Sequence, residues 1–172
     1  IGFDKCGTST LYNFFKQNGI SSIHYDNGEL AKIMLSNYQQ NKKLLHGKYA
    51  NITAFFDMEH VNLENSISIP LTLFKELDQQ YPGSKFILNT RNKEAWLKSR
   101  SLQTIHPSGD TLLKISAEIL KLTEEEMLEQ WSHEWDEHYR DVLEYFKKRP
   151  NDLLVFNIEK DNPEKIKSFF KD

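Results

Sequence analysis

The chain has 172 residues, with 22 basic and 25 acidic side chains and a formal net charge of −3. A hydrophobic content of 38% excludes a disordered chain and is enough for a single domain over residues 1–172 with a sizeable core. The charge balance excludes bulk nucleic-acid binding, and the single cysteine, Cys6, excludes an intrachain disulfide and a cysteine-based zinc site. No apolar run reaches the length of a membrane span and no signal peptide is visible. The opening at Ile1, within an expected strand, indicates that this strand is trimmed at its start.

Strand and helix patterns alternate through the first half of the chain. After an apolar lead and a polar turn, residues at helical spacing predict a helix that ends at Asn18-Gly19. The predicted helices of this half cover residues 8–17 and 29–38. Its predicted strands cover residues 20–25 and 52–58. Residues 39–48 are polar and read as a loop. Residues 59–68 lack a clear period, and we expect them to form a loop near the site.

The second half continues the alternation. Pro70 opens a helix that Tyr81-Pro82-Gly83 closes, and residues 106–109 form a clear break. Thr123 followed by Glu126 predicts a capping box at the start of the longest helix. The other predicted elements are strands over residues 85–90 and 153–158, and helices from Lys93 and over residues 110–120, 123–148 and 163–170. This order predicts an α/β fold of three α/β/α layers with a central, mostly parallel sheet.

The first eleven residues carry the strongest candidate site. A short loop that runs into a helix start binds anions well, because backbone N–H groups are free and the helix dipole favours negative charge. Gly7 permits close approach of a ligand, Lys5 supplies a positive charge, and Thr8, Ser9 and Thr10 supply hydroxyl donors. The loop is not a Walker A motif, because its lysine precedes the glycine.

A second candidate phosphate site follows the strand over residues 85–90. Arg91 lies at the carboxyl end of this strand, where ligands of parallel α/β sheets bind, and Ser99 lies eight residues later on the next helix. An arginine can bind a phosphate through two parallel hydrogen bonds, and a serine hydroxyl adds a further donor. A solvated arginine and a plain helix-surface serine are the alternatives.

The order Lys-x-Gly-Thr-[Ser/Thr]-[Ser/Thr]-Leu resembles the 5′-phosphosulfate loop of sulfotransferases that use 3′-phosphoadenosine 5′-phosphosulfate (PAPS). Strand-Arg-x7-Ser resembles their 3′-phosphate-binding segment, and residues 74–99 and 138–158 look like a sulfotransferase subgroup widespread in bacteria. The resemblance implies a P-loop-like sulfotransferase fold, PAPS as donor and 3′-phosphoadenosine 5′-phosphate (PAP) as product. The chain departs from the cytosolic sulfotransferases in lacking a late R-K-G-x-x-G-like segment over the nucleotide. The cofactor-binding residues that the resemblance implies are Lys5, Cys6, Gly7, Thr8, Ser9, Thr10, Arg91 and Ser99.

The acceptor of such a reaction needs a general base, and two clusters qualify. His24 and Asp26 end the second strand, about where several sulfotransferase families carry a catalytic carboxylate. Asp57, followed by Glu59 and His60, ends the third strand, nearer to where cytosolic sulfotransferases carry their histidine. A turn-forming Asp26 and a solvated or capping Asp57 are the structural alternatives, and both clusters remain candidates.

Lys5 is expected to neutralise the leaving 5′-phosphate. We expect no metal, because His133 and His138 are five residues apart, off the spacing of a shared ligand face. Cys6 lies at a helix start, where thiols become reactive, but its companions are phosphate donors rather than a histidine base. It is therefore interpreted as a loop residue.

The sequence thus predicts a transferase that moves a sulfuryl group from PAPS to a hydroxyl or amine of a small molecule, glycan or glycolipid. The alternatives are a P-loop nucleotide or small-molecule kinase and a non-catalytic domain that binds PAP or a glycan. The resemblance implies a cytoplasmic location for a bacterial protein and the Golgi lumen for a eukaryotic one.

Overall fold

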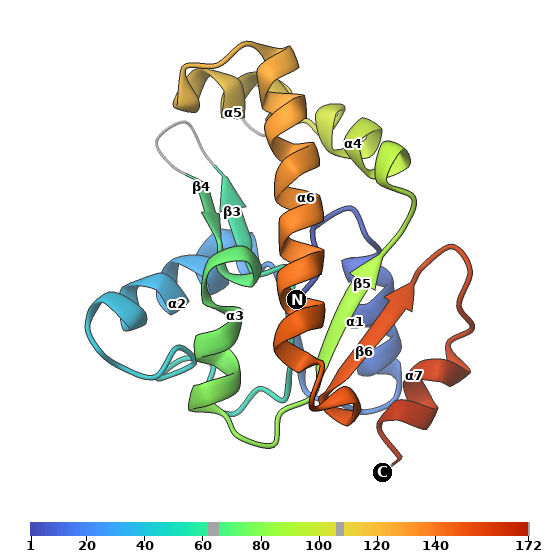
Figure 1. Ribbon diagram of the computed structural model, residues 1–172. Helices are drawn as coiled ribbons and strands as arrows, with labels where there is room; N and C mark the ends of the chain where they lie inside the picture. Colours follow the sequence, from blue (N-terminus) through green and yellow to red (C-terminus); the bar gives the residue numbers. More distant parts are fainter. Residues whose placement is uncertain (62–65, 106–108, 172) are drawn as a thin grey trace.

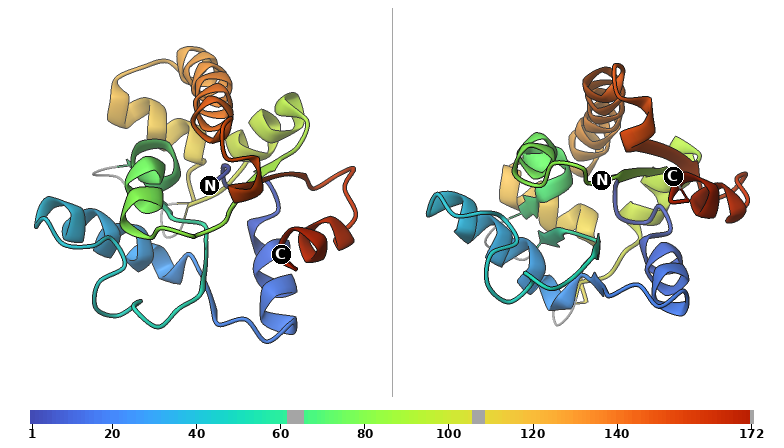
Figure 2. Two further views of the ribbon diagram at one scale, coloured as in Figure 1. Left: turned by 60° about the horizontal axis from the view of Figure 1, so that its bottom comes forward. Right: turned by 90° about the horizontal axis from the view of Figure 1, so that it is seen from below.

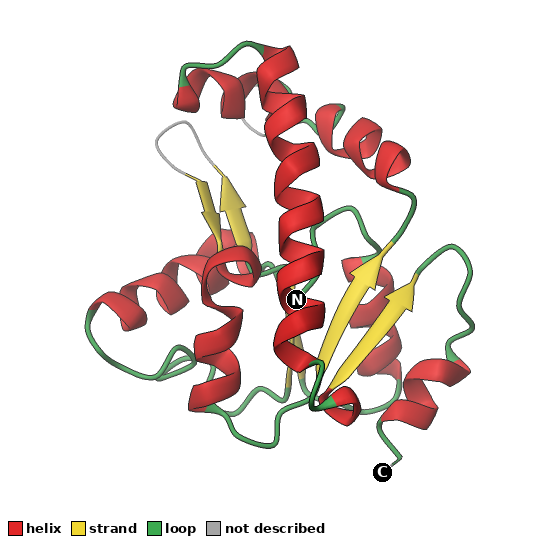
Figure 3. Ribbon diagram, viewed as in Figure 1, coloured by secondary structure: helices red, strands yellow, loops and turns green. Residues whose placement is uncertain are grey.

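The computed structural model describes residues 1–61, 66–105 and 109–171 (Figure 1). Most of the predicted break at residues 106–109 therefore lies outside the described residues. The helices are α1 (Thr8–Gln17), α2 (Glu29–Gln39), α3 (Ile69–Gln80), α4 (Lys93–Ser101), α5 (Leu112–Leu120), α6 (Glu124–Phe146) and α7 (Glu164–Phe169). The strands are β1 (Ser22–His24), β2 (Ala54–Phe56), β3 (Glu59–Val61), β4 (Ser66–Ser68), β5 (Phe86–Thr90) and β6 (Leu153–Asn157). The predicted α/β class is confirmed, and Figure 3 shows helices packed around short strands.

The strands form three two-stranded pairs in the described part of the chain. β1 pairs with β2 and β5 with β6, both in parallel as predicted, whereas β3 and β4 are antiparallel. Residues 1–3 run beside β5, where the Ile1 amino group donates to the Ile87 carbonyl at 2.7 Å. A cavity of about 860 Å³, lined by residues of β2 and of β5, separates the two parallel pairs. The described strands therefore form separate pairs instead of one continuous ladder.

The prediction of a loop over residues 59–68 is wrong, because β3 and β4 form a short antiparallel pair there, flanking residues 62–65, which are not described. Each strand has only three residues, and Glu59 and His60 are buried polar side chains. The apolar alternation that would reveal a strand is therefore missing. The strand predicted over residues 52–58 is also shorter than expected, because Asp57 adopts a left-handed backbone conformation (φ 55°) that ends β2.

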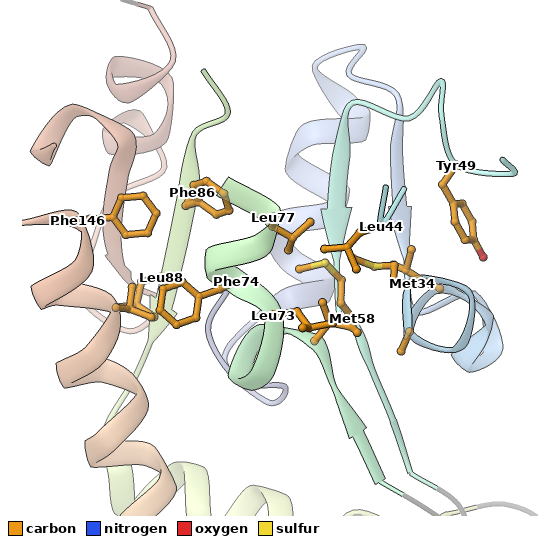
Figure 4. Close-up of a cluster of buried hydrophobic side chains, with 14 residues drawn as sticks. Met34, Leu44, Tyr49, Met58, Leu73, Phe74, Leu77, Phe86, Leu88 and Phe146 are labelled. Atoms are coloured by element: carbon orange, nitrogen blue, oxygen red, sulfur yellow. The ribbon is translucent and has the colours of Figure 1, made fainter. Parts of the chain in front are cut away.

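Helix α6 crosses the molecule and supplies apolar side chains to two of its three cores. Thr123 and Glu126 form the predicted capping box at its start. At its end, Phe146 packs in the largest core together with residues of α2, α3 and β5 (Figure 4). This core includes Met34, Leu44, Leu73, Phe74, Phe86 and Leu88. A smaller core joins α1 to β2, β6 and α7, and the views in Figure 2 place α1 and α7 on the same side of the molecule.

The core most relevant to the site lies between α4, α6 and the start of the chain. Trp131 and Trp135, four residues apart on α6, are both buried there and form a packing stripe on this helix. Phe3 stacks on Trp135 with ring centroids 5.3 Å apart, and Trp96 packs against the same indole at 4.5 Å. This aromatic cluster anchors the segment that leads directly into the candidate phosphate loop.

His138 contributes to the same anchoring. Its ring is buried and its Nε2 donates to the Ile1 carbonyl over 2.7 Å. Burial lowers the pKa of His138 to about 4, so the ring is neutral at neutral pH.

Within the described part of the chain, no helix has both the length and the apolar character needed to cross a membrane.

Candidate active site

The candidate phosphate loop spans residues 4–7, and α1 starts directly after it. Lys5 and Gly7 both have left-handed backbone conformations, with φ of 55° and 76°, so the chain curls before entering the helix. Gly7 is the N-cap, and no side chain caps α1. The first N–H groups of the helix are therefore available to an anion, and the helix dipole favours one there. A Cβ atom at Gly7 would lie 2.9 Å from Cγ2 of Ile158, which explains the need for glycine.

Lys5 is the cation of this loop. Its ammonium group forms no ion pair or hydrogen bond with any residue that the structure describes, while its carbonyl accepts from Nη1 of Arg91 at 3.1 Å. The neighbouring Cys6 is buried, and burial together with the charge of Asp4 raises the pKa of its thiol to about 12. A protonated, buried thiol is no nucleophile, so Cys6 is a loop residue whose carbonyl accepts from the Asn89 side chain.

His24 connects the start of α1 to the end of β2. Its Nε2 lies 3.1 Å from the Thr8 hydroxyl, 3.3 Å from the Ser9 hydroxyl and 3.5 Å from Oδ2 of Asp57. Burial lowers the pKa of His24, which favours the neutral ring. β1 and β2 are parallel, so His24 and Asp57 emerge at the same edge of the pair. Thr10, the third predicted hydroxyl donor, is exposed on α1.

Asp57 has the proton affinity expected of a base that works near neutrality. Burial raises the pKa of its carboxyl to about 7, and the nearby Asp4 carboxylate adds to the rise. Arg100 and Lys5 act in the opposite direction and lower it. A catalytic base is most effective when its pKa lies near the working pH.

Asp26, the other candidate carboxylate, is held elsewhere. Its Oδ2 accepts from the Lys48 ammonium at 2.6 Å and from the Tyr49 hydroxyl at 2.7 Å. These two hydrogen bonds lower the pKa of Asp26. The structure gives this carboxylate no contact with the phosphate loop.

Arg91 and Ser99 lie at the positions predicted for them, one after β5 and the other on α4. The Arg91 guanidinium is docked against the loop through the Lys5 carbonyl and is paired with Glu159, whose Oε1 lies 3.0 Å from Nη2 and 3.2 Å from Nε. Ser99 is half-buried, and its hydroxyl has no hydrogen bond to any described residue. Arg91 thus links the two predicted phosphate sites, while Glu159 occupies the remaining face of its guanidinium.

A buried cluster of ionisable side chains, Asp4, Glu59 and Arg100, was not predicted from the sequence. Nη1 of Arg100 contacts Oδ1 of Asp4 and lies 3.4 Å from Oε2 of Glu59. Burial and the Asp4 carboxylate raise the pKa of Glu59 well above its ordinary range. Each member lies within two residues of a predicted site residue, and this adjacency was the only signal in the sequence.

The described residues include no group of three or more His, Cys, Asp or Glu side chains that could hold a metal ion. What they do bring together is an uncapped helix start, a free lysine, a docked arginine, and a histidine–carboxylate pair beside two hydroxyls. These features define an α/β protein with a candidate site for an anionic ligand and, next to it, a group that can accept a proton.

A family model described as a sulfotransferase domain matches residues 1–163 of the chain. The chain therefore belongs to this sulfotransferase family, which confirms the resemblance to sulfotransferases and identifies the protein as a transferase. A search of curated proteins gives no match to the chain.

Proposed function

We propose that this domain transfers the sulfuryl group of PAPS to a hydroxyl or amine of a small-molecule or glycan acceptor. When bound, PAPS supplies the sulfuryl group, and PAP is the product. The observation that carries the proposal is the meeting of the uncapped α1 start with the His24–Asp57 pair. An anion site and a base near neutrality are the two parts that transfer to a hydroxyl requires.

The 5′ side of the donor fits the phosphate loop. Lys5 has no competing partner among the described residues, and the N–H groups from Cys6 to Thr10 surround the helix start. We assign Lys5 and these N–H groups to stabilising the charge that develops on the leaving 5′-phosphate. Removal of one such charge-assisted donor typically costs on the order of 3 kcal/mol, or about 10²-fold in rate.

The 3′ side of the donor is assigned to Arg91 and Ser99. A 3′-phosphate distinguishes PAPS from ATP and AMP, so these residues would decide which nucleotide binds. The Ser99 hydroxyl is available, whereas the guanidinium of Arg91 must share or exchange its contacts with Glu159. The bound arrangement would keep the Lys5 carbonyl as the anchor of Arg91.

Asp57 is assigned as the general base, with His24 as its partner. A carboxyl with a pKa of about 7 can accept the acceptor's proton and release it again near neutral pH. We assign His24 to holding Asp57 relative to Thr8 and Ser9, since its Nε2 lies within hydrogen-bonding distance of both hydroxyls and 3.5 Å from Oδ2 of Asp57.

Calorimetric titration with PAP and with AMP tests the donor assignment. We expect PAP to bind more tightly than AMP, and Lys5→Ala to weaken both nucleotides. Arg91→Ala should weaken PAP more than AMP, because only PAP carries the 3′-phosphate. Lys16→Ala and Arg140→Ala, which remove exposed cations of α1 and α6, serve as controls. Equal affinity for PAP and AMP in the wild type would overturn the assignment.

Sulfuryl transfer from PAPS to simple hydroxyl acceptors tests the base. Asp57→Asn should lose about 10²–10⁴-fold in turnover, the usual contribution of a positioned base. The wild-type rate should rise with pH through about 7, because Asp57 must lose its proton before it can accept one. Asp26→Asn is the matched control, and we expect it to retain turnover. A loss in Asp26→Asn with activity in Asp57→Asn would reverse the assignment.

A further inference from the structure

Arg100 is a buried arginine that the proposed reaction does not use directly. It lies on α4 next to Ser99, and its guanidinium packs over the Trp131 ring with Cζ 4.9 Å from the centroid. Nη1 serves Asp4 and Glu59 together, while Nε is buried without a partner among the described residues. Burying a guanidinium is costly unless it is paired, so these contacts hold the surrounding segments in one arrangement.

The partners of Arg100 come from segments that carry the proposed site. Asp4 directly precedes Lys5 in the phosphate loop, and Glu59 opens β3 two residues after Asp57. A second contact ties the loop to α4, because Nε1 of Trp96 donates to the Asp4 carbonyl at 3.2 Å. Ser99 and Arg100 share α4, so the 3′ side, the 5′ side and the base are joined through one buried guanidinium.

We propose that Arg100 is a positioning residue that joins the phosphate loop, the Asp57 segment and the Ser99 helix into one unit, so that the donor site and its base form together. This inference rests on the proposed sulfotransferase function. It assigns Arg100 no contact with the donor or the acceptor.

The same cluster controls the charge around Asp57. Asp4 opposes ionisation of the Asp57 carboxyl, whereas Arg100 favours it. Removal of the Asp4 charge should therefore lower the pKa of Asp57, and removal of the Arg100 charge should raise it. A purely mechanical role of Arg100 would not produce these opposite shifts. The charged and titratable groups around Asp57 are Asp4 and Lys5 from the loop, His24 and Tyr25 from the β1 end, Glu59 from β3 and Arg100 from α4.

The test compares Asp4→Asn, Arg100→Met and the double variant by the pH dependence of kcat with PAPS. We expect the acid limb to move to lower pH in Asp4→Asn and to higher pH in Arg100→Met, each by about one pH unit. In the double variant, the acid limb should return toward its wild-type position. PAP affinity should fall about tenfold in Arg100→Met, because the loop and α4 lose their common anchor. Arg140→Met is the matched control, since Arg140 also faces two carboxylates but is exposed.

Carboxyl NMR titration of Asp57 in the same proteins measures its pKa without turnover. Opposite shifts in the two single variants support the inference even if no transfer from PAPS is found, an outcome that would remove the proposed function alone. Shifts in the same direction, or no shift in either variant, overturn the inference. If Arg100→Met does not fold, the double variant and Arg100→Lys take its place. Arg100→Lys keeps the charge, so its acid limb in the pH profile should match the wild type while its affinity for PAP falls. Unchanged affinity for PAP in Arg100→Lys would overturn the positioning role of Arg100.

Discussion

Arg91 shows how the partner of a single residue decides what that residue can do. Its guanidinium bonds to the Lys5 carbonyl and to Glu159, whose carboxylate lies where a phosphate could otherwise be bound. Glu159 also accepts from the backbone N–H of Asn92, the N-cap of α4, which holds the carboxylate in place. The carboxylate and the 3′-phosphate of the proposed donor are both anions, so they would compete for the same donors.

Glu159→Gln separates the hydrogen bond of Glu159 to Asn92 from its charge beside Arg91. Glutamine keeps an acceptor for the Asn92 N–H but loses the charge, so we expect PAP to bind about fivefold to tenfold more tightly, while AMP affinity stays unchanged. Calorimetric titration measures both affinities. Glu164→Gln, which removes an exposed carboxylate of α7, is the control. Weaker PAP binding in Glu159→Gln would show that Glu159 supports the nucleotide site.

At the scale of the elements, α1 depends on the conformation of the residue that precedes it. Its N-cap, Gly7, combines a left-handed conformation with a side-chain position that Ile158 already occupies. Gly19, beyond the other end of the helix, has nearly the same φ of 77°, but a Cβ there would meet nothing within 4 Å. The two glycines therefore share the backbone requirement and differ only in the crowding.

Gly7→Ala and Gly19→Ala isolate that crowding. Each variant pays for a left-handed alanine, which costs roughly 1–2 kcal/mol. Gly7→Ala must also displace Ile158, so we expect it to lose more unfolding free energy than Gly19→Ala and to bind PAP weakly. Denaturant unfolding and PAP titration measure the two effects. Equal losses of stability and unchanged PAP affinity in both variants would contradict a closely packed loop.

At the scale of the whole molecule, buried titratable groups give opposing pH dependences of stability. Glu59 has a pKa raised from 4.5 to about 8, because it is buried beside Asp4. The unfolded chain releases this proton at lower pH, so its stabilising effect is complete below the ordinary carboxyl pKa and is lost as the pH rises toward 8. His138 acts oppositely, because its folded pKa of about 4 lies below 6.5 and its contribution is lost as the pH falls through that window.

Glu59→Gln removes the pH-dependent contribution of Glu59 to stability. We expect the unfolding free energy of the variant, relative to the wild type, to rise between pH 4.5 and about 8, since glutamine cannot ionise. Denaturant unfolding across this range measures the difference. Glu144→Gln, at an exposed position of α6, should show no such trend, and a trend of the same size there would argue against Glu59 as the cause.

Local patterns in the sequence were enough to predict the α/β class, most of the helices, the capping box of α6 and the two junctions before helices that carry the candidate phosphate motifs. These features are local: helical periodicity, cap chemistry and a loop followed by a helix are written in neighbouring residues. Contacts between distant segments set the partner of Asp26, the pairing of Arg91 with Glu159, the raised pKa of Asp57 and the buried cluster around Arg100. Asp4 and Arg100 are 96 positions apart, and a pKa depends on burial and neighbouring charges that no local pattern records. The tertiary structure also divided the expected sheet, because strand pairing depends on which distant segments meet.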